Sequence, residues 1–151
     1  PWSPRVTTDT TAIPRLDDQL CADLVAASRA IVTAYDATLG RLGVDYPQYL
    51  ALLVLWEADG PVGISHLAAR LRLPVEQLQP TVRSMVVART ATRTPDATDP
   101  AGWAVAAGPR AEELRAGVTQ AHCDIKARLG MGALEFRELQ ETLRSITRAM
   151  S

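Results

Sequence analysis

The chain has 151 residues, which suffices for one globular domain or for a long-helix protomer that completes its core by pairing with a second copy. Hydrophobic residues make up 47% and charged residues 22% of the chain, a balance that excludes a disordered or collagen-like protein. Sixteen basic and seventeen acidic residues give a formal net charge of −1, which argues against a chain coated with positive charge for non-specific binding to nucleic acids or membranes.

The sequence shows no sign of a membrane segment or of a metal site. No apolar stretch approaches the roughly 18 to 20 residues that cross a bilayer, and the first residues lack the layout of a signal peptide. We therefore expect a cytoplasmic protein with no membrane partner. His66 and His122 are the two histidines, and the side chain of His122 diverges by about 100° from that of Cys123 on a helix. We expect no metal and no cofactor.

The N-terminal third predicts an arm and two helices. Residues 1–13 are rich in threonine and proline without apolar periodicity, which predicts a flexible arm. From Pro14 onward, apolar residues recur at the spacing of one helical face until Gly40 and Gly43, which predicts a long helix. Asp45 and Gln48 have the pattern of a capping box and open a second, more buried helix through residues 50–56.

The middle of the chain has the layout of a helix-turn-helix followed by a hairpin. Two short helices are predicted over residues 64–71 and from residue 75 to about residue 89, joined at Leu73-Pro74. Turn residues over 95–102 separate two short stretches of strand character, which predicts a small β-hairpin. Pro109 then opens a further helix, and the break at residues 130–132 precedes the last one.

These elements predict a mainly α fold with a small β-hairpin. A winged helix-turn-helix over residues 45–107 is bracketed by long N- and C-terminal helices over residues 14–43 and 109–151, and together they form a single domain over residues 14–151. The long terminal helices present more apolar surface than a winged helix of this size covers, so we expect them to form a homodimer.

A family resemblance is carried by four short segments between residues 16 and 60. They are Leu16-Asp17-Asp18-Gln19-Leu20-Cys21, Ala27-Ser28-Arg29, Tyr46-Pro47-Gln48-Tyr49-Leu50 and Leu53-Val54-Leu55-Trp56-Glu57. In these segments the chain resembles the MarR family of bacterial regulators, and more narrowly its OhrR branch, which senses organic hydroperoxides. The resemblance continues more weakly to about Arg89 and is only architectural beyond that residue.

The resemblance implies a redox-sensing site at Cys21. In the OhrR branch the matching cysteine is the peroxide-reactive thiol, and tyrosines that match Tyr35 and Tyr46 reach it from the partner subunit. Some members carry a second cysteine, comparable with Cys123, that resolves the oxidised thiol as an intersubunit disulfide. A further tyrosine of some members is Val25 here, so one hydrogen bond to the thiol is absent.

General thiol chemistry agrees with this role but also leaves an inert one open. The thiolate is the form that attacks a peroxide, and nearby hydrogen-bond donors or a helix N-terminus favour it. Its first product is a sulfenic acid, which a second thiol condenses to a disulfide. The alternative is that Cys21 is a small apolar residue of an amphipathic helix with no reactivity. Whether Cys123 pairs with Cys21 depends on a Cα separation that the sequence does not give.

The DNA-facing half departs from the family pattern. A helix-turn-helix reads the major groove with its second helix, whose polar and basic side chains contact bases and phosphates. The candidate DNA-binding residues are Gln77, Gln79, Arg83, Ser84 and Arg93. Family members place a Ser-Gly-Thr-like start on this helix and an Asp-x-Arg element at the wing tip. This chain has Val75-Glu76-Gln77 and Asp99-Pro100-Ala101 instead, so the arginine of the wing tip is missing.

Two functions therefore remain open. The first is a homodimeric repressor that binds a near-palindromic DNA operator and senses organic hydroperoxides or another small molecule through Cys21. The second is a MarR-like protein with weakened DNA binding that binds or transforms a small molecule in the cleft between its helices. Under the first function the chain is not an enzyme.

Overall fold

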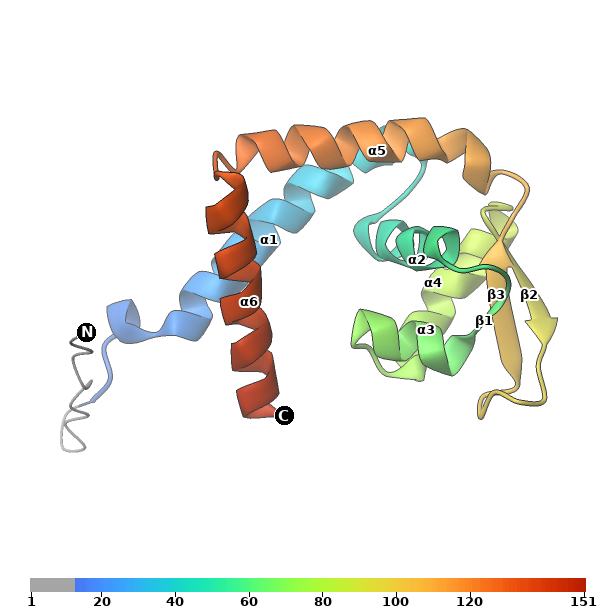
Figure 1. Ribbon diagram of the computed structural model, residues 1–151, viewed down its shortest axis with the longest axis horizontal. Helices are drawn as coiled ribbons and strands as arrows, with labels where there is room; N and C mark the ends of the chain where they lie inside the picture. The colour runs from blue at the N-terminus through green and yellow to red at the C-terminus, as the bar shows by residue number, and fades with distance from the viewer. Residues whose placement is uncertain (1–12) are drawn as a thin grey trace.

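The computed structural model describes residues 13–151 and confirms the mainly α fold with a small sheet (Figure 1). The arm predicted for residues 1–13 lies, apart from Ile13, outside the described residues. The helices are α1 (Leu20–Leu39), α2 (Tyr46–Glu57), α3 (Ile64–Leu71), α4 (Val75–Val87), α5 (Ala111–Arg128) and α6 (Ala133–Met150). The strands β1 (Val62–Gly63), β2 (Ala91–Pro95) and β3 (Trp103–Ala107) form an antiparallel sheet in the order β1-β3-β2.

The first helix is shorter than its apolar period predicts. A 3₁₀ turn occupies Leu16–Asp18, and Gln19 is extended, so the α-helical ladder begins only at Leu20. At the other end Gly40 does not stop the chain from coiling, because a second 3₁₀ turn runs over Gly40–Leu42. Gly43 ends this turn in the left-handed region with φ of 72°, a conformation that glycine adopts without steric cost.

Helix α2 is the centre of the core. Its capping box is present as predicted: Asp45 accepts a hydrogen bond from the backbone N–H of Gln48, and the Gln48 side chain accepts one from the backbone N–H of Asp45. Five of its residues are buried, namely Tyr49, Ala51, Leu52, Val54 and Leu55. They contact apolar side chains of all the neighbouring elements, so α2 joins the helix-turn-helix to the long helices.

The helix-turn-helix has the predicted boundaries within about two residues. Between α3 and α4, Arg72 adopts a left-handed conformation with φ of 56°, and the backbone N–H of Leu73 donates to the carbonyl of Ala68. Leu67, Leu78 and Val82 are fully buried and hold the two helices together. Pro80 lies inside α4, but on its exposed side.

The wing contains one strand that the sequence analysis missed. Strand β1 has only two residues, and Val62 pairs with Val105 on the inner strand of the hairpin. Two residues are too few for an alternating pattern to be recognised in a sequence. The pairing attaches the start of α3 to the hairpin, so the wing and the helix-turn-helix form one unit.

The long helices form a second part of the molecule. In Figure 1, α5 runs along the upper edge beside α1, and α6 turns away from its end, clear of the winged helix. Helix α6 has no buried residue. Its apolar side chains Leu139, Leu143 and Met150 are exposed. No helix within residues 13–151 combines the length and the apolar character that crossing a bilayer requires.

Candidate functional site

Cys21 is the second residue of α1 and is exposed to solvent. A thiol in the first turn of a helix lies near the positive end of the helix dipole. Cys123 is also exposed, on the outer side of α5, and neither cysteine is in a disulfide among the described residues. Both thiols are therefore accessible to small reagents.

The two cysteines lie far apart within one chain. The hydroxyl of Tyr35 on α1 is 3.2 Å from Nδ1 of His122 on α5, which places Cys123 beside Tyr35 along the helix pair. Cys21 precedes Tyr35 by fourteen residues on the same helix, a rise of about 21 Å at 1.5 Å per residue. A disulfide needs Cα atoms about 5.5 Å apart, so Cys21 and Cys123 bond only between two copies of the chain.

The three tyrosines of the chain form one aromatic cluster. The ring centroids of Tyr35 and Tyr46 are 5.1 Å apart, those of Tyr35 and Tyr49 are also 5.1 Å apart, and those of Tyr46 and Tyr49 are 5.8 Å apart. Such separations are typical of favourable aromatic packing. The structure thus brings Tyr35 and Tyr46 together as the redox hypothesis requires, but about 20 Å from the Cys21 of their own chain.

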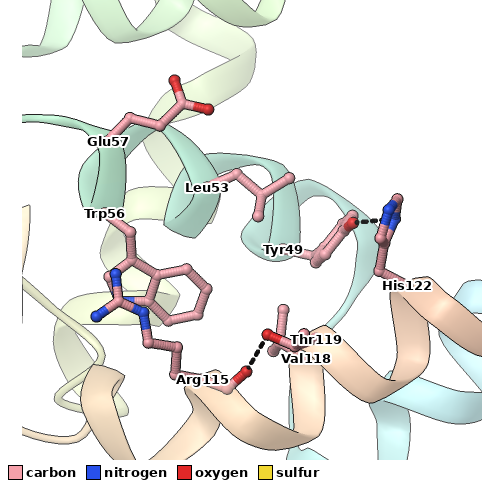
Figure 2. Close-up of a pocket in the computed structure, with 8 residues that line it drawn as sticks. All are labelled: Tyr49, Leu53, Trp56, Glu57, Arg115, Val118, Thr119 and His122. Atoms are coloured by element: carbon pink, nitrogen blue, oxygen red, sulfur yellow. Dashed lines mark hydrogen bonds between the residues drawn. The ribbon is translucent and has the colours of Figure 1, made fainter.

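His122 connects this cluster to α5. Its Nδ1 atom is 3.2 Å from the hydroxyl of Tyr35 and 3.4 Å from that of Tyr49 (Figure 2 shows the second contact). Burial, and then the neighbouring hydroxyl of Tyr35, raise the pKa of Tyr49 above its ordinary value. Burial and Tyr35 also raise the pKa of Tyr46. These hydroxyls stay protonated at neutral pH and remain hydrogen-bond donors.

Tyr49 and His122 were missed as site residues by the sequence analysis. The spacing of Tyr46 and Tyr49 was the available signal, since residues three apart lie on one face of a helix. The contact with His122 bridges 73 residues of sequence, and no local pattern reports such a contact. The sequence suggests for His122 only the chemistry of a metal ligand, whereas in the structure its ring is hydrogen-bonded to tyrosines.

A cavity of about 330 Å³ opens between α2 and α5 beside the tyrosine cluster (Figure 2). Its walls are mostly apolar, and a few polar groups face it from both helices. The lining residues are Tyr49, Leu53, Trp56, Glu57, Arg115, Val118, Thr119 and His122. The volume is at the lower end of the range for small-molecule sites.

Trp56, a lining residue of this cavity, has an unpaired indole N–H. The indole Nε1 of Trp56 is buried and has no hydrogen-bond acceptor among residues 13–151. The guanidinium carbon of Arg115 lies 5.4 Å from the centroid of the Trp56 ring. A buried N–H without an acceptor is unfavourable by about 1 to 3 kcal/mol. Because this N–H is closed off from solvent, it does not face the open cavity.

The predicted recognition helix is α4, and its outer face is mixed in chemistry. Opposite the buried Leu78, Val82 and Met85, the side chains that point furthest from the core recur at helical spacing. They are Glu76, Pro80, Arg83 and Val87, all of which are exposed. Gln77 and Ser84 are exposed on one flank of this face, and Gln79 is half-buried on the other.

A groove between α4 and the wing lies beside this face. It has a volume of about 640 Å³, and its lining includes Glu76, Gln79 and Arg83 of α4 and Pro100 and Ala101 of the wing loop. The structure thus brings Gln79 and Arg83 to one groove. Gln77 and Ser84 do not line it.

The wing loop is attached to the start of α3 through Asp99. The Asp99 carboxylate accepts hydrogen bonds from the backbone N–H of Ser65 at 3.1 Å and from its hydroxyl at 2.9 Å. A Cβ added at Gly63 would lie 2.7 Å from Oδ2 of Asp99, so a larger residue here would displace the Asp99 carboxylate. Asp99 is thereby held away from the open groove rather than projecting from it.

Arg93 is the remaining predicted DNA contact. Its guanidinium carbon lies 3.8 Å from the centroid of the Trp103 ring, within the range of a cation–π interaction. In the register of the hairpin Arg93 pairs with Val105, whose side chain is buried, so both residues lie on the inner face of the sheet. The stacking holds the Arg93 side chain in a half-buried position.

Similar proteins agree with this architecture. An X-ray structure of a MarR-family transcriptional regulator from Rhodococcus sp. RHA1 superposes with a TM-score of 0.78 at 21% identity, over 89% of this chain and 97% of that one. This match decides the fold. The chain has the winged-helix fold of a MarR-family regulator. No known family model matches the chain.

Two curated relatives match the chain over shorter stretches. The HTH-type transcriptional regulator TtmR of Methylorubrum extorquens (strain PA1) is 37% identical over 84 residues, which are 56% of this chain and 43% of the relative. The organic hydroperoxide resistance transcriptional regulator of Bacillus subtilis (strain 168) is 38% identical over 71 residues, 47% of this chain and 48% of the relative. The matches span less than half the length of each relative.

The wing attachment gives a testable prediction. Replacing Asp99 with Ala removes the acceptor of two hydrogen bonds at the start of α3, and we expect the free energy of unfolding to fall by about 1 to 3 kcal/mol. Hydrogen exchange of the Ser65 amide should accelerate in the same variant. Asp96→Ala is the matched control, because Asp96 bonds only within its own exposed loop. Equal effects of the two substitutions would contradict the role of Asp99.

Proposed function

We propose that the chain is a homodimeric DNA-binding regulator of the MarR family, a repressor rather than an enzyme, whose DNA affinity responds to oxidation of Cys21. The observation that carries this proposal is an exposed recognition helix set beside a wing in a MarR-type fold. The resemblance to regulators that are named for organic hydroperoxide resistance and for transcription supports it.

The apolar surface of the terminal helices supports dimerisation. Along α6, Phe136, Leu139, Leu143, Ile146 and Met150 follow the alternating three- and four-residue spacing of a coiled-coil seam. None of them is buried in the single chain. At the start of the domain Leu16 and Leu20 are 76% and 59% exposed. A second copy with its own helices in this region covers these faces by two-fold symmetry.

The dimer can be tested on α6. Introducing a charge with Leu143→Glu should convert the dimer to a monomer in sedimentation velocity at micromolar concentration, since a charge in an apolar seam is strongly unfavourable. Ser145→Glu adds the same charge on another face of α6 and should leave the dimer intact. A monomeric parent protein under these conditions would overturn the dimer.

DNA recognition follows from the dimer. A two-fold axis presents two α4 helices to successive major grooves, which requires a separation of about 34 Å and a near-palindromic operator. On each half, Arg83 and Gln79 reach the groove between helix and wing, and Gln77 and Ser84 flank the exposed face. On the wing, Arg93 supplies the basic side chain. The exposed carboxylate of Glu76 repels DNA phosphates, so we expect a weaker affinity for DNA than a wholly basic helix gives.

Arg83 is the sharpest test of this surface. Arg83→Ala should weaken binding to a palindromic duplex from the protein's own upstream region by about 1 to 3 kcal/mol if the side chain contacts a base. Gel retardation at physiological salt measures the effect, and Arg137→Ala on α6 is a control of equal charge. An unchanged affinity for Arg83→Ala would remove this residue from the reading surface.

The thiol chemistry requires an organic hydroperoxide as oxidant. The thiolate of Cys21 attacks the terminal peroxide oxygen, the O–O bond breaks, and the alkoxide takes a proton and leaves as an alcohol, which gives a sulfenic acid. The thiol of the partner subunit's Cys123 then attacks the sulfenic sulfur, forms the S–S bond and releases water. Because Cys21 and Cys123 are far apart in one chain, this bond joins the two subunits.

Non-reducing gels test this sequence. Mild treatment with cumene hydroperoxide should produce a covalent dimer that is absent from Cys21→Ser and from Cys123→Ser. The single variants serve as controls for each other, since both retain one thiol. A covalent dimer that persists in Cys21→Ser would mean that Cys123 pairs with itself across the two-fold axis, and it would overturn the sensor.

The cavity between α2 and α5 supports a second candidate function. Its mostly apolar walls and the Arg115 side chain in its lining fit a small molecule with an aromatic or apolar body and a hydrogen-bond acceptor. Under this candidate the chain has lost most of its DNA affinity and binds or transforms such a ligand. The retardation experiment separates the two candidates, because no shift at micromolar protein favours the second.

A further inference from the structure

We propose that His122 withholds the hydroxyl proton of Tyr35 from the thiolate of the partner subunit's Cys21, and so sets how reactive that thiol is. The inference rests on the proposed thiol sensing and assigns it a further positioning residue. His122 does not touch the thiol; it acts through Tyr35. The observation behind it is that Tyr35 already has a hydrogen-bond partner inside its own chain.

The two buried hydroxyls identify Nδ1 of His122 as an acceptor. Tyr35 is 7% exposed and Tyr49 is 4% exposed, and a buried hydroxyl needs an acceptor for its proton. Nδ1 lies within 3.2 Å of the first and 3.4 Å of the second. A neutral imidazole has one nitrogen that donates and one that accepts, and the accepting nitrogen has a single lone pair in the ring plane.

The number of free hydroxyl protons determines how many hydrogen-bond donors are available to a thiolate. Tyr35 has one hydroxyl proton, and it is committed to Nδ1 at the shorter of the two distances. Tyr49 keeps its proton because its pKa is raised by burial and by Tyr35. Tyr46 has no hydrogen-bond partner for its hydroxyl among residues 13–151 and is half-buried. Of the two tyrosines assigned to the thiol, only Tyr46 therefore has a free donor.

Removing the acceptor should release the second donor. In His122→Leu the hydroxyl of Tyr35 has lost Nδ1, and its remaining acceptors are the neutral hydroxyl oxygen of Tyr49 and the charged thiolate of the partner's Cys21. The charged acceptor forms the stronger hydrogen bond. One hydrogen bond to the charged form of a thiol should raise the rate of its reaction at pH 7 by about three- to tenfold. His122→Asn keeps an acceptor oxygen near the position of Nδ1 and should react like the parent protein.

The experiment measures alkylation of Cys21 by iodoacetamide in the reduced full chain, with peptide mass spectrometry to resolve Cys21 from Cys123. The rate of Cys123 in the same sample is the internal reference. We expect faster alkylation in His122→Leu, the parent rate in His122→Asn, and no acceleration when His122→Leu is combined with Tyr35→Phe. A merely structural effect of His122 would not be cancelled by removing one hydroxyl.

Two results would overturn the inference while leaving thiol sensing intact. One is a rate in His122→Leu that equals or falls below the parent rate, and the other is an acceleration that persists without the Tyr35 hydroxyl. Failure of thiol sensing has a different signature: Cys21 of the parent protein reacts no faster than glutathione, and Tyr46→Phe changes nothing. That result would overturn both proposals.

Discussion

The packing of the buried face of α2 is the interaction on which the other parts of the molecule depend. One side of this helix forms the core of the helix-turn-helix, and another side meets α5 and the tyrosine cluster. Leu52 and Leu55 are almost entirely buried, and Tyr49, on the same helix, contacts His122 of α5. Because α2 belongs to both halves, the tyrosines and the cavity are in direct contact with the helix that supports α3 and α4.

This shared helix connects the cavity and the tyrosine cluster to the helix-turn-helix. Trp56 and Glu57 end α2 at the cavity, and Glu57 forms a 3.1 Å ion pair with Arg70 of α3. The pair is exposed, and such pairs contribute at most about 1 kcal/mol, so it guides the position of α3 without fixing it. The buried apolar contacts of α2 stabilise the position of α3 more than this ion pair does, because they remove far more surface from water.

Much of the fold could be predicted from the sequence because its signals are local. The capping box of Asp45 and Gln48, the breaks at Gly43 and Leu73-Pro74, and the apolar period of each helix all lie within a few residues of one another. The site was harder to predict. The resemblance singled out Tyr35 and Tyr46, but the bond from Tyr35 to His122 joins positions 87 residues apart, and the tie from Ser65 to Asp99 spans 34. Contacts of that kind depend on the packing of whole elements.

Pro80 has a consequence for what α4 shows to a partner. A proline has no backbone N–H, so the carbonyl oxygen of Glu76, one turn earlier, receives no hydrogen bond from the next turn of its own helix. Both residues belong to the most exposed stripe of α4. Helix α4 therefore has, in its first turns, a main-chain acceptor that lacks the usual intrahelical partner, whatever side chain occupies position 76. A donor group on whatever contacts this face of α4 can bond to that acceptor.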